Sequence, residues 1–86
     1  MEKKIRTVTI TVQDREKSFK DVSAILHDLA DNIILRVGYP FPNQNISIIF
    51  IIIQLTNDEL GAFTGKLGQL TSVNVKSTSL KIQTEI

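Results

Sequence analysis

The longest apolar run in the chain, residues 46–53 with one serine, lies within residues 46–55, the segment that constrains the fold more than any other. It is rich in isoleucine, and β-branched side chains favour a strand. Because side chains alternate between the two faces of a strand, one face carries Ile48, Phe50 and Ile52, and the other carries Ile49, Ile51, Ile53 and Leu55. The run is far shorter than the roughly 20 residues that a membrane-spanning helix needs. It therefore predicts a central strand of a globular protein that is apolar on both faces.

The rest of the chain supplies three more strands and two helices. Residues 5–12 alternate β-branched side chains, residues 33–37 form a short apolar segment, and residues 73–82 alternate again, with an apolar face that switches between Val75 and Leu80. Apolar residues at helical spacing follow Asp14, a predicted N-cap, and Thr56, which with Glu59 matches a capping box. Residues 38–45 contain both prolines and predict a loop that ends the second strand.

The predicted order of elements is βαββαβ. Two right-handed crossovers place both helices on one face of a four-stranded antiparallel sheet, with the first and third strands at its centre. We therefore expect an α+β, ferredoxin-like fold, and 86 residues make residues 1–86 a single domain.

Composition excludes several classes of function. The formal net charge is +1, and only Lys3, Lys4 and Arg6 hint at a basic face, which argues against direct nucleic-acid binding and against polybasic attachment to a membrane. The chain has no cysteine and one histidine, His27, so we expect no metal site and no cofactor. No apolar leader follows the charged start, and a soluble, cytoplasmic protein is the simplest expectation. His27 is expected at the edge of the first helix, bonded to Asp31.

Two groups of residues leave alternatives open. Gly61, Gly65 and Gly68 form one stripe on the second helix, where each glycine costs about 1 kcal/mol relative to alanine. The stripe indicates either close approach by a ligand or a second subunit, or tight packing against the first helix, which we favour. Arg36 beside Tyr39 and Phe41 could clamp an anion, although an arginine that extends to solvent is the commoner case.

The two-sided apolar strand predicts an oligomer. A two-layer fold covers one face of its sheet, so the other apolar face needs a partner. We expect the bulky Phe50 side to meet the helices. Ile49, Ile51 and Ile53 would then point outward, beside Thr7, Thr9 and Thr11, and form the interface of a dimer or tetramer.

Five short segments together resemble one protein family: residues 14–17, 27–28, 34–40, 48–50 and 65–69. They are similar to the family of iron-only hydrogenase system regulators, and the likeness runs from Ile5 to about Ser77. The resemblance implies a ferredoxin-like unit akin to ACT domains and to the C-terminal domains of nickel-responsive regulators, which oligomerises and regulates an iron-only hydrogenase system. His27 alone cannot supply a nickel site of that kind, and the turn of residues 13–15 lacks the glycine of many amino-acid-binding ACT domains.

The functional hypothesis is therefore an oligomeric regulator that senses a small molecule or docks on a hydrogenase-related protein. The alternative is a structural or interaction module without a ligand. An enzyme is not expected, since no arginine-bearing glycine-rich loop of the acylphosphatase kind joins the first strand to the first helix.

Overall fold

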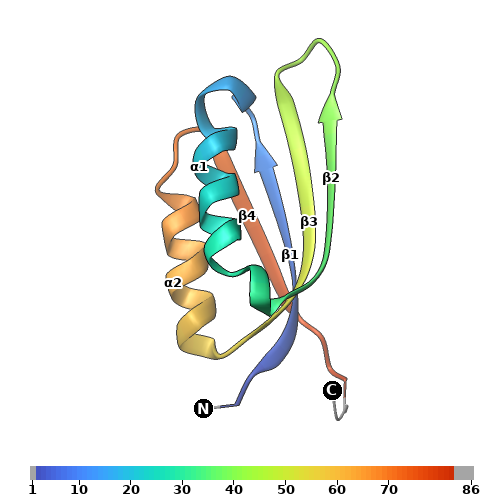
Figure 1. The fold of residues 1–86 in the computed structure, drawn as a ribbon, viewed down its shortest axis with the longest axis vertical. Helices are drawn as coiled ribbons and strands as arrows, with labels where there is room; N and C mark the ends of the chain where they lie inside the picture. The colour runs from blue at the N-terminus through green and yellow to red at the C-terminus, as the bar shows by residue number, and fades with distance from the viewer. Residues whose placement is uncertain (1, 83–86) are drawn as a thin grey trace.

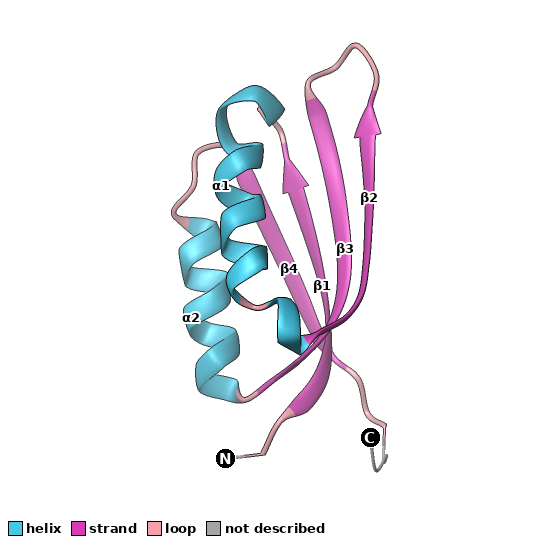
Figure 2. Cartoon of the chain, in the orientation of Figure 1, coloured by secondary structure: helices cyan, strands magenta, loops and turns pink. Residues whose placement is uncertain are grey.

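The computed structural model describes residues 2–82, and Figures 1 and 2 show its two layers. In chain order the elements are β1 (Lys4–Val12), α1 (Arg15–Asp28), the short 3₁₀ helix η1 (Ala30–Asn32), β2 (Ile33–Phe41), β3 (Ile46–Leu55), α2 (Asn57–Gly68) and β4 (Val73–Ser79). The strands pair antiparallel in the order β2-β3-β1-β4. Both helices lie on one face of this sheet (Figure 1). The predicted α+β, ferredoxin-like fold with β1 and β3 at its centre is confirmed.

Both helices begin at the predicted caps. The Asp14 carboxylate accepts a hydrogen bond from the Lys17 amide at 3.2 Å and starts α1. Before α2, the Thr56 hydroxyl accepts from the Glu59 amide at 3.1 Å, and the Glu59 carboxylate accepts from the Thr56 amide at 2.9 Å. This reciprocal capping box satisfies two backbone donors that the first turn of a helix leaves unpaired.

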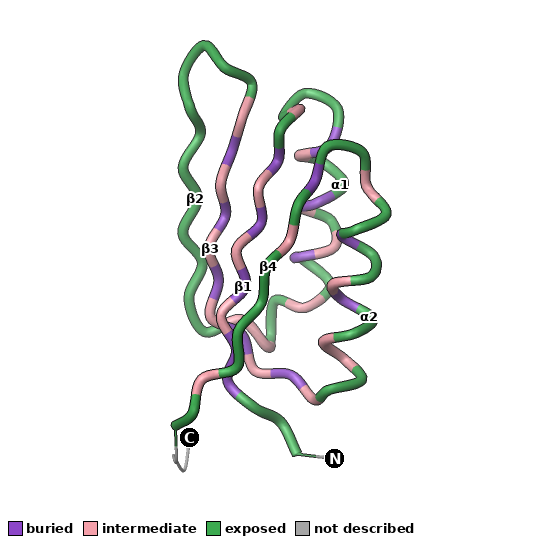
Figure 3. Tube along the Cα trace, turned by 180° about the vertical axis from the view of Figure 1, so that it is seen from behind, coloured by how far each residue is buried: buried purple, intermediate pink, exposed green. Residues whose placement is uncertain are grey.

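The core lies between the sheet and the helices. Its fully buried members come from β1, β3 and the inner sides of the helices: Val8, Ile10, Val12, Val22, Leu26, Ile49, Ile51, Ile53, Leu55, Phe63 and Leu67. Along β3, buried and half-buried residues alternate, as Figure 3 shows from behind the sheet. Burying each such side chain contributes about 1.5–3 kcal/mol to folding, so this layer is the main source of stability.

The predicted orientation of β3 is wrong. Ile49, Ile51 and Ile53 are at most 1% exposed and face the helices, whereas Phe50 is half-buried on the opposite face. The register with β1 is the reason, because it pairs Ile49 with the core residue Ile10. Paired residues of an antiparallel sheet share a face, so the isoleucines follow the valines and isoleucine of β1, and Phe50 lies opposite Thr9.

Strand β2 is longer than predicted and irregular. It continues through Gly38 and Pro40 to Phe41, where a loop was expected. Proline is tolerated here because β2 is an edge strand, which need not donate hydrogen bonds on its open side. Its register with β3 shifts between Ile33 and Leu35, so that Ile34 is the extra residue of a β-bulge.

Strand β4 is shorter than predicted. It ends at Ser79, before Leu80, and its pairing with β1 has no register shift, so the expected change of apolar face falls outside the strand. The amide of Leu80 still donates to the Ile5 carbonyl at 3.0 Å.

Arg6 is a core residue rather than part of a basic surface. It is 3% exposed, and its guanidinium donates to the Leu55 carbonyl from Nε and Nη2, to Ser79 Oγ at 2.9 Å and to Asn57 Oδ1 at 2.7 Å. These bonds join the end of β3, the start of α2 and the end of β4. Burial of this charge is compensated by four hydrogen bonds, the condition under which a buried polar group is tolerated.

Candidate functional site

The face of the sheet opposite the helices is the most prominent candidate surface. The register of β1, β2 and β3 turns the following side chains to this face: Thr7, Thr9, Thr11, Leu35, Val37, Tyr39, Phe41, Ile46, Ile48, Phe50 and Ile52. We call this set the open sheet face. It contains eight apolar or aromatic side chains, and Lys76 of the edge strand β4, which pairs with Thr9, adds a charge beside it on the same side of the sheet. Neither helix covers it (Figure 1), and Val37 and Tyr39 are 52% and 58% exposed.

The bulge in β2 turns four of the eight apolar or aromatic side chains to this face. Ile33 pairs with Ile53 on the helix side, but after the extra residue Ile34 the odd-numbered residues of β2 point outward. Val37 is therefore opposite Phe50, and Tyr39 is opposite Ile48. The rings of Tyr39 and Phe41 meet edge to face, 5.1 Å apart. Aromatic pairs of this geometry are favourable beyond their buried area, so the outer rim of the face is ordered.

The glycine stripe does not pack against α1. Gly61, Gly65 and Gly68 are exposed, and a Cβ atom placed on any of the three would meet nothing within 4 Å. The favoured prediction of tight packing between the helices is therefore wrong. Larger side chains, Phe63 and Leu67, make the buried face of α2 and hold its backbone away from its neighbours. The alternative prediction, approach by a second subunit or a ligand, remains a prediction.

Arg36 and the two aromatic residues lie on opposite faces. Arg36 pairs with Ile51 and faces the helix side, whereas Tyr39 and Phe41 belong to the open sheet face. The alternative of an anion clamp made by the arginine and both aromatic rings is therefore not formed, and Arg36 is exposed, as the favoured interpretation expected. Arg36 instead lines a groove of about 570 Å³ between α1 and β2, together with Lys20, Ser23 and His27.

His27 lies on the exposed side of α1, in that groove. Among residues 2–82 the structure shows no hydrogen bond between His27 and Asp31, the partner predicted for it. The same residues contain no group of three or more histidine, cysteine or acidic side chains that could hold a metal ion. No helix among them is both long and apolar enough to cross a membrane.

Among the titratable groups of residues 2–82, Glu59 is the one whose pKa is clearly shifted. The hydrogen bond from the Thr56 amide, and then the ammonium group of Lys3 at 3.2 Å, lower the pKa of Glu59 below its ordinary value. Thr56 forms the N-cap of α2 with Glu59, and Lys3 joins the N-terminal segment to the same carboxylate. This shift therefore belongs to the helix cap and does not mark a catalytic group.

Comparison with known proteins agrees with this architecture. The chain is similar to the structure of the uncharacterized protein TM1266 from Thermotoga maritima, with 46% identity, a TM-score of 0.87, and coverage of 93% of this chain and 100% of the other. The ACT domain from GTP pyrophosphokinase of Chlorobium tepidum is 18% identical over 88% of this chain and 99% of its own, with a TM-score of 0.73, which shows a shared fold. A search of curated proteins found no match.

The family assignment rests on most of the chain. Residues 4–77 match the family described as "TM1266-like: Iron-only hydrogenase system regulator, putative". The match spans β1 through most of β4 and agrees with the resemblance seen in the sequence. This chain belongs to the TM1266-like family of iron-only hydrogenase system regulators.

Proposed function

We propose that this protein regulates an iron-only hydrogenase system as a homo-oligomer, in which two copies join through their open sheet faces. The family description supports the regulatory role. The single observation that supports association is the open sheet face, which exposes a continuous apolar surface on β2 and β3. A surface of this kind on a small domain marks an interface.

A second copy of the same chain fits this face. The part of the face on β1, β2 and β3 carries only apolar, hydroxyl and aromatic side chains, so two copies can pack this part together without burying like charges. Lys76 faces the same side from the edge strand β4, opposite Thr9, and would lie at the margin of the interface. If β4 is included, with Asn74, Lys76 and Thr78 on the same side, four strands about 4.8 Å apart and about nine residues long cover roughly 550–600 Å² in projection. Because side chains project from the sheet, the accessible area is larger than this projected area and approaches the ~800 Å² that each partner contributes to a standard interface.

Face-to-face association is also favoured over pairing at the β2 edge. The β2 edge carries Pro40 and the bulge at Ile34, two features that hinder addition of another strand. The open sheet face has no such obstacle. In the proposed assembly the helices of both copies remain on the outside, free to contact a small molecule or a hydrogenase-related partner protein.

Light scattering on the purified protein tests this proposal. The wild-type chain should give a mass at least twice its 9.6 kDa at micromolar concentration. Val37→Lys, which adds a charge to an exposed position of the face, should fold and shift the mass toward the monomer. Ala62→Lys, which adds the same charge beside the glycine stripe on α2, is the matched control and should leave the mass unchanged.

Three results would contradict the proposal. A wild-type chain that stays monomeric at high concentration would show that the protein does not form the proposed oligomer. A Val37→Lys variant that folds and keeps the wild-type mass would remove the face from the interface. Dissociation by Ala62→Lys alone would move the interface to α2.

A further inference from the structure

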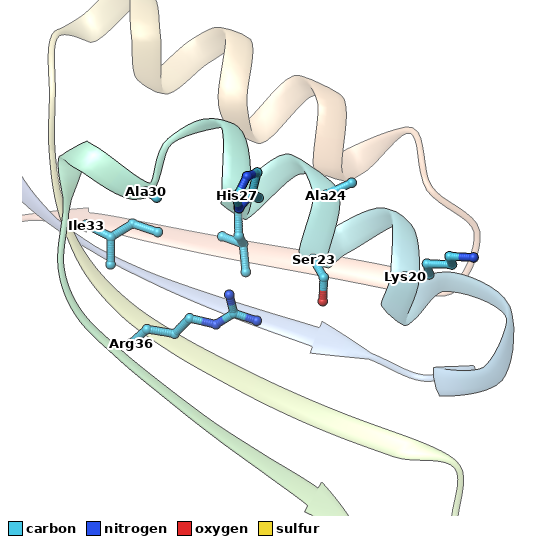
Figure 4. A pocket seen from close by; sticks show the side chains of 8 residues that line it. Lys20, Ser23, Ala24, His27, Ala30, Ile33 and Arg36 are labelled. Carbon is cyan, nitrogen blue, oxygen red and sulfur yellow. The ribbon is translucent and has the colours of Figure 1, made fainter.

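We propose that the groove between α1 and β2 binds a small, doubly charged oxyanion, either a phosphate monoester or a dicarboxylate. The inference names the ligand class for the sensing role and so rests on the proposed function. Figure 4 shows the groove from close by, with Arg36 extending from β2 toward the side of α1 that carries Ser23 and His27. Lys20 lies one turn before Ser23 on the same helix.

The β2 bulge directs Arg36 into the groove. Ile33 and Arg36 both face the helix side, although they are three positions apart and a regular strand would place them on opposite faces. The extra residue Ile34 shifts the alternation of side chains between the two faces by one position and so turns the Arg36 side chain away from the open sheet face. Bulges are frequent beside functional sites because they re-aim one side chain in this way.

The groove collects positive charge without an acidic partner. No carboxylate lines it, and within residues 2–82 the single ion pair joins Lys3 to Glu59, far from the groove in the chain. Lys20 and Arg36 make no hydrogen bond to another described side chain. Unpaired cations in a concave site raise the local concentration of anions, and the planar guanidinium matches the geometry of carboxylate and phosphate oxygens.

A second, smaller hollow extends the positive strip along β2. It measures about 170 Å³ and shares Arg36 with the main groove. Arg15 lines its far side, held in place by a 2.9 Å hydrogen bond from Nε to Ser47 Oγ and by stacking 4.4 Å from the Phe19 ring. Gly38 contributes no side chain, and a Cβ there would meet nothing within 4 Å, so the hollow stays open.

Hydrogen bonds fix the groove at both ends. Near the β2–β3 turn, the Asn45 carbonyl accepts from the Arg15 amide at 2.8 Å, and Asn45 Oδ1 accepts from the Glu16 amide at 3.0 Å. At the other end, Asn32 Nδ2 donates to the Gln54 carbonyl at 3.1 Å, just before β2 begins. The distance between α1 and β2 is therefore set by the fold before any ligand arrives.

The dimensions and lining select a small ligand. A groove of about 570 Å³ falls within the usual range for small-molecule sites, about 300–1,000 Å³. Leu26, Ile33 and two alanines give it an apolar floor, which suits a short carbon skeleton. Arg36 and Lys20 supply two positive charges, which match a phosphate monoester of charge about −1.5 to −2 at pH 7 or a dicarboxylate.

NMR titration of ¹⁵N-labelled protein tests the inference with two named probes, glycerol 3-phosphate and succinate, at constant ionic strength set with chloride. Saturable amide shifts should appear along residues 20–27 and 33–38. Arg36→Gln should weaken binding about tenfold, because a hydrogen-bonded charge pair is lost. Lys20→Gln should weaken it as well. Lys66→Gln removes the same charge from α2 and is the matched control, expected to bind as wild type.

The outcomes separate this inference from the proposed oligomer. Saturation by one probe alone identifies the phosphate or the dicarboxylate as the ligand chemistry. Shifts that never saturate, or that are equal in Arg36→Gln and Lys66→Gln, would show general surface charge and overturn the site. If Arg36→Gln fails to fold, the comparison of Lys20→Gln with Lys66→Gln decides in the same way. Light scattering on the same samples reports the oligomer independently, so either proposal can fail while the other stands.

Discussion

Alanine in place of Gly61 or Gly65 should stabilise the protein. Both positions lie in the interior of α2, exposed, with open space where a Cβ would be placed. In such a position glycine loses more backbone entropy on folding than alanine and costs about 1 kcal/mol. No packing term opposes this gain.

The expected size of the effect follows from that open space. Each substitution should raise the free energy of unfolding by about 0.5–1 kcal/mol, which for a domain of this size corresponds to a rise in Tm of roughly 2–8 °C. Gly65→Val should fall between wild type and Gly65→Ala, since valine is a weaker helix former but meets no steric obstacle. Gly68→Ala, at the last residue of the helix, should give a smaller gain.

Thermal unfolding followed by circular dichroism, at one fixed protein concentration, measures these differences. A Gly65→Val variant less stable than wild type would refute the reasoning, because it would show that the stripe meets a surface in solution. Loss of the oligomer in Gly65→Val, with an intact fold, would identify that surface as a second subunit.

Three further predictions concern the core and the cap. Arg6→Met should lower the free energy of unfolding, measured by urea titration, by at least about 2 kcal/mol, because the buried acceptors of Leu55 and Asn57 lose their donor. An unchanged urea midpoint would contradict this. Ile51→Lys should unfold the chain, judged by circular dichroism, whereas Phe50→Lys should keep the fold, and the reverse result would restore the orientation expected from sequence. Wild type should be more stable than Glu59→Gln, and this difference in free energy of unfolding should be full above pH 4.5, the ordinary pKa of Glu59. It should decline as the pH falls through the lowered pKa of Glu59 in the folded state. A difference that does not change with pH would exclude this linkage.

Local sequence patterns were sufficient to predict the fold. The alternation in residues 5–12, the helical spacing after Asp14 and Thr56, and the capping box each specify structure over short distances, and the topology followed from their order. The end of β2 was missed because proline and glycine usually end a strand. That rule weakens at a sheet edge, and sequence alone does not say which strand is the edge.

The candidate surfaces were harder to predict because they depend on register. The orientation of β3 follows from which β1 residue pairs with Phe50, a long-range relation that no local pattern contains. The direction of Arg36 depends on a single extra residue in β2. Arg6 could have been found, since it continues the even-numbered core positions Val8 and Ile10 of β1. Its charge instead favoured a surface interpretation.

Intermolecular NOEs test the central claim most directly, namely that two copies meet through their open sheet faces. In a sample that mixes isotope-labelled and unlabelled protein, only contacts between copies give filtered signals. We predict signals that join the Phe50 ring of one copy to the methyl groups of Ile48 or Val37 of another. Filtered signals from α2 beside Gly61 and Gly65, or none at concentrations where the protein is oligomeric by mass, would contradict the claim.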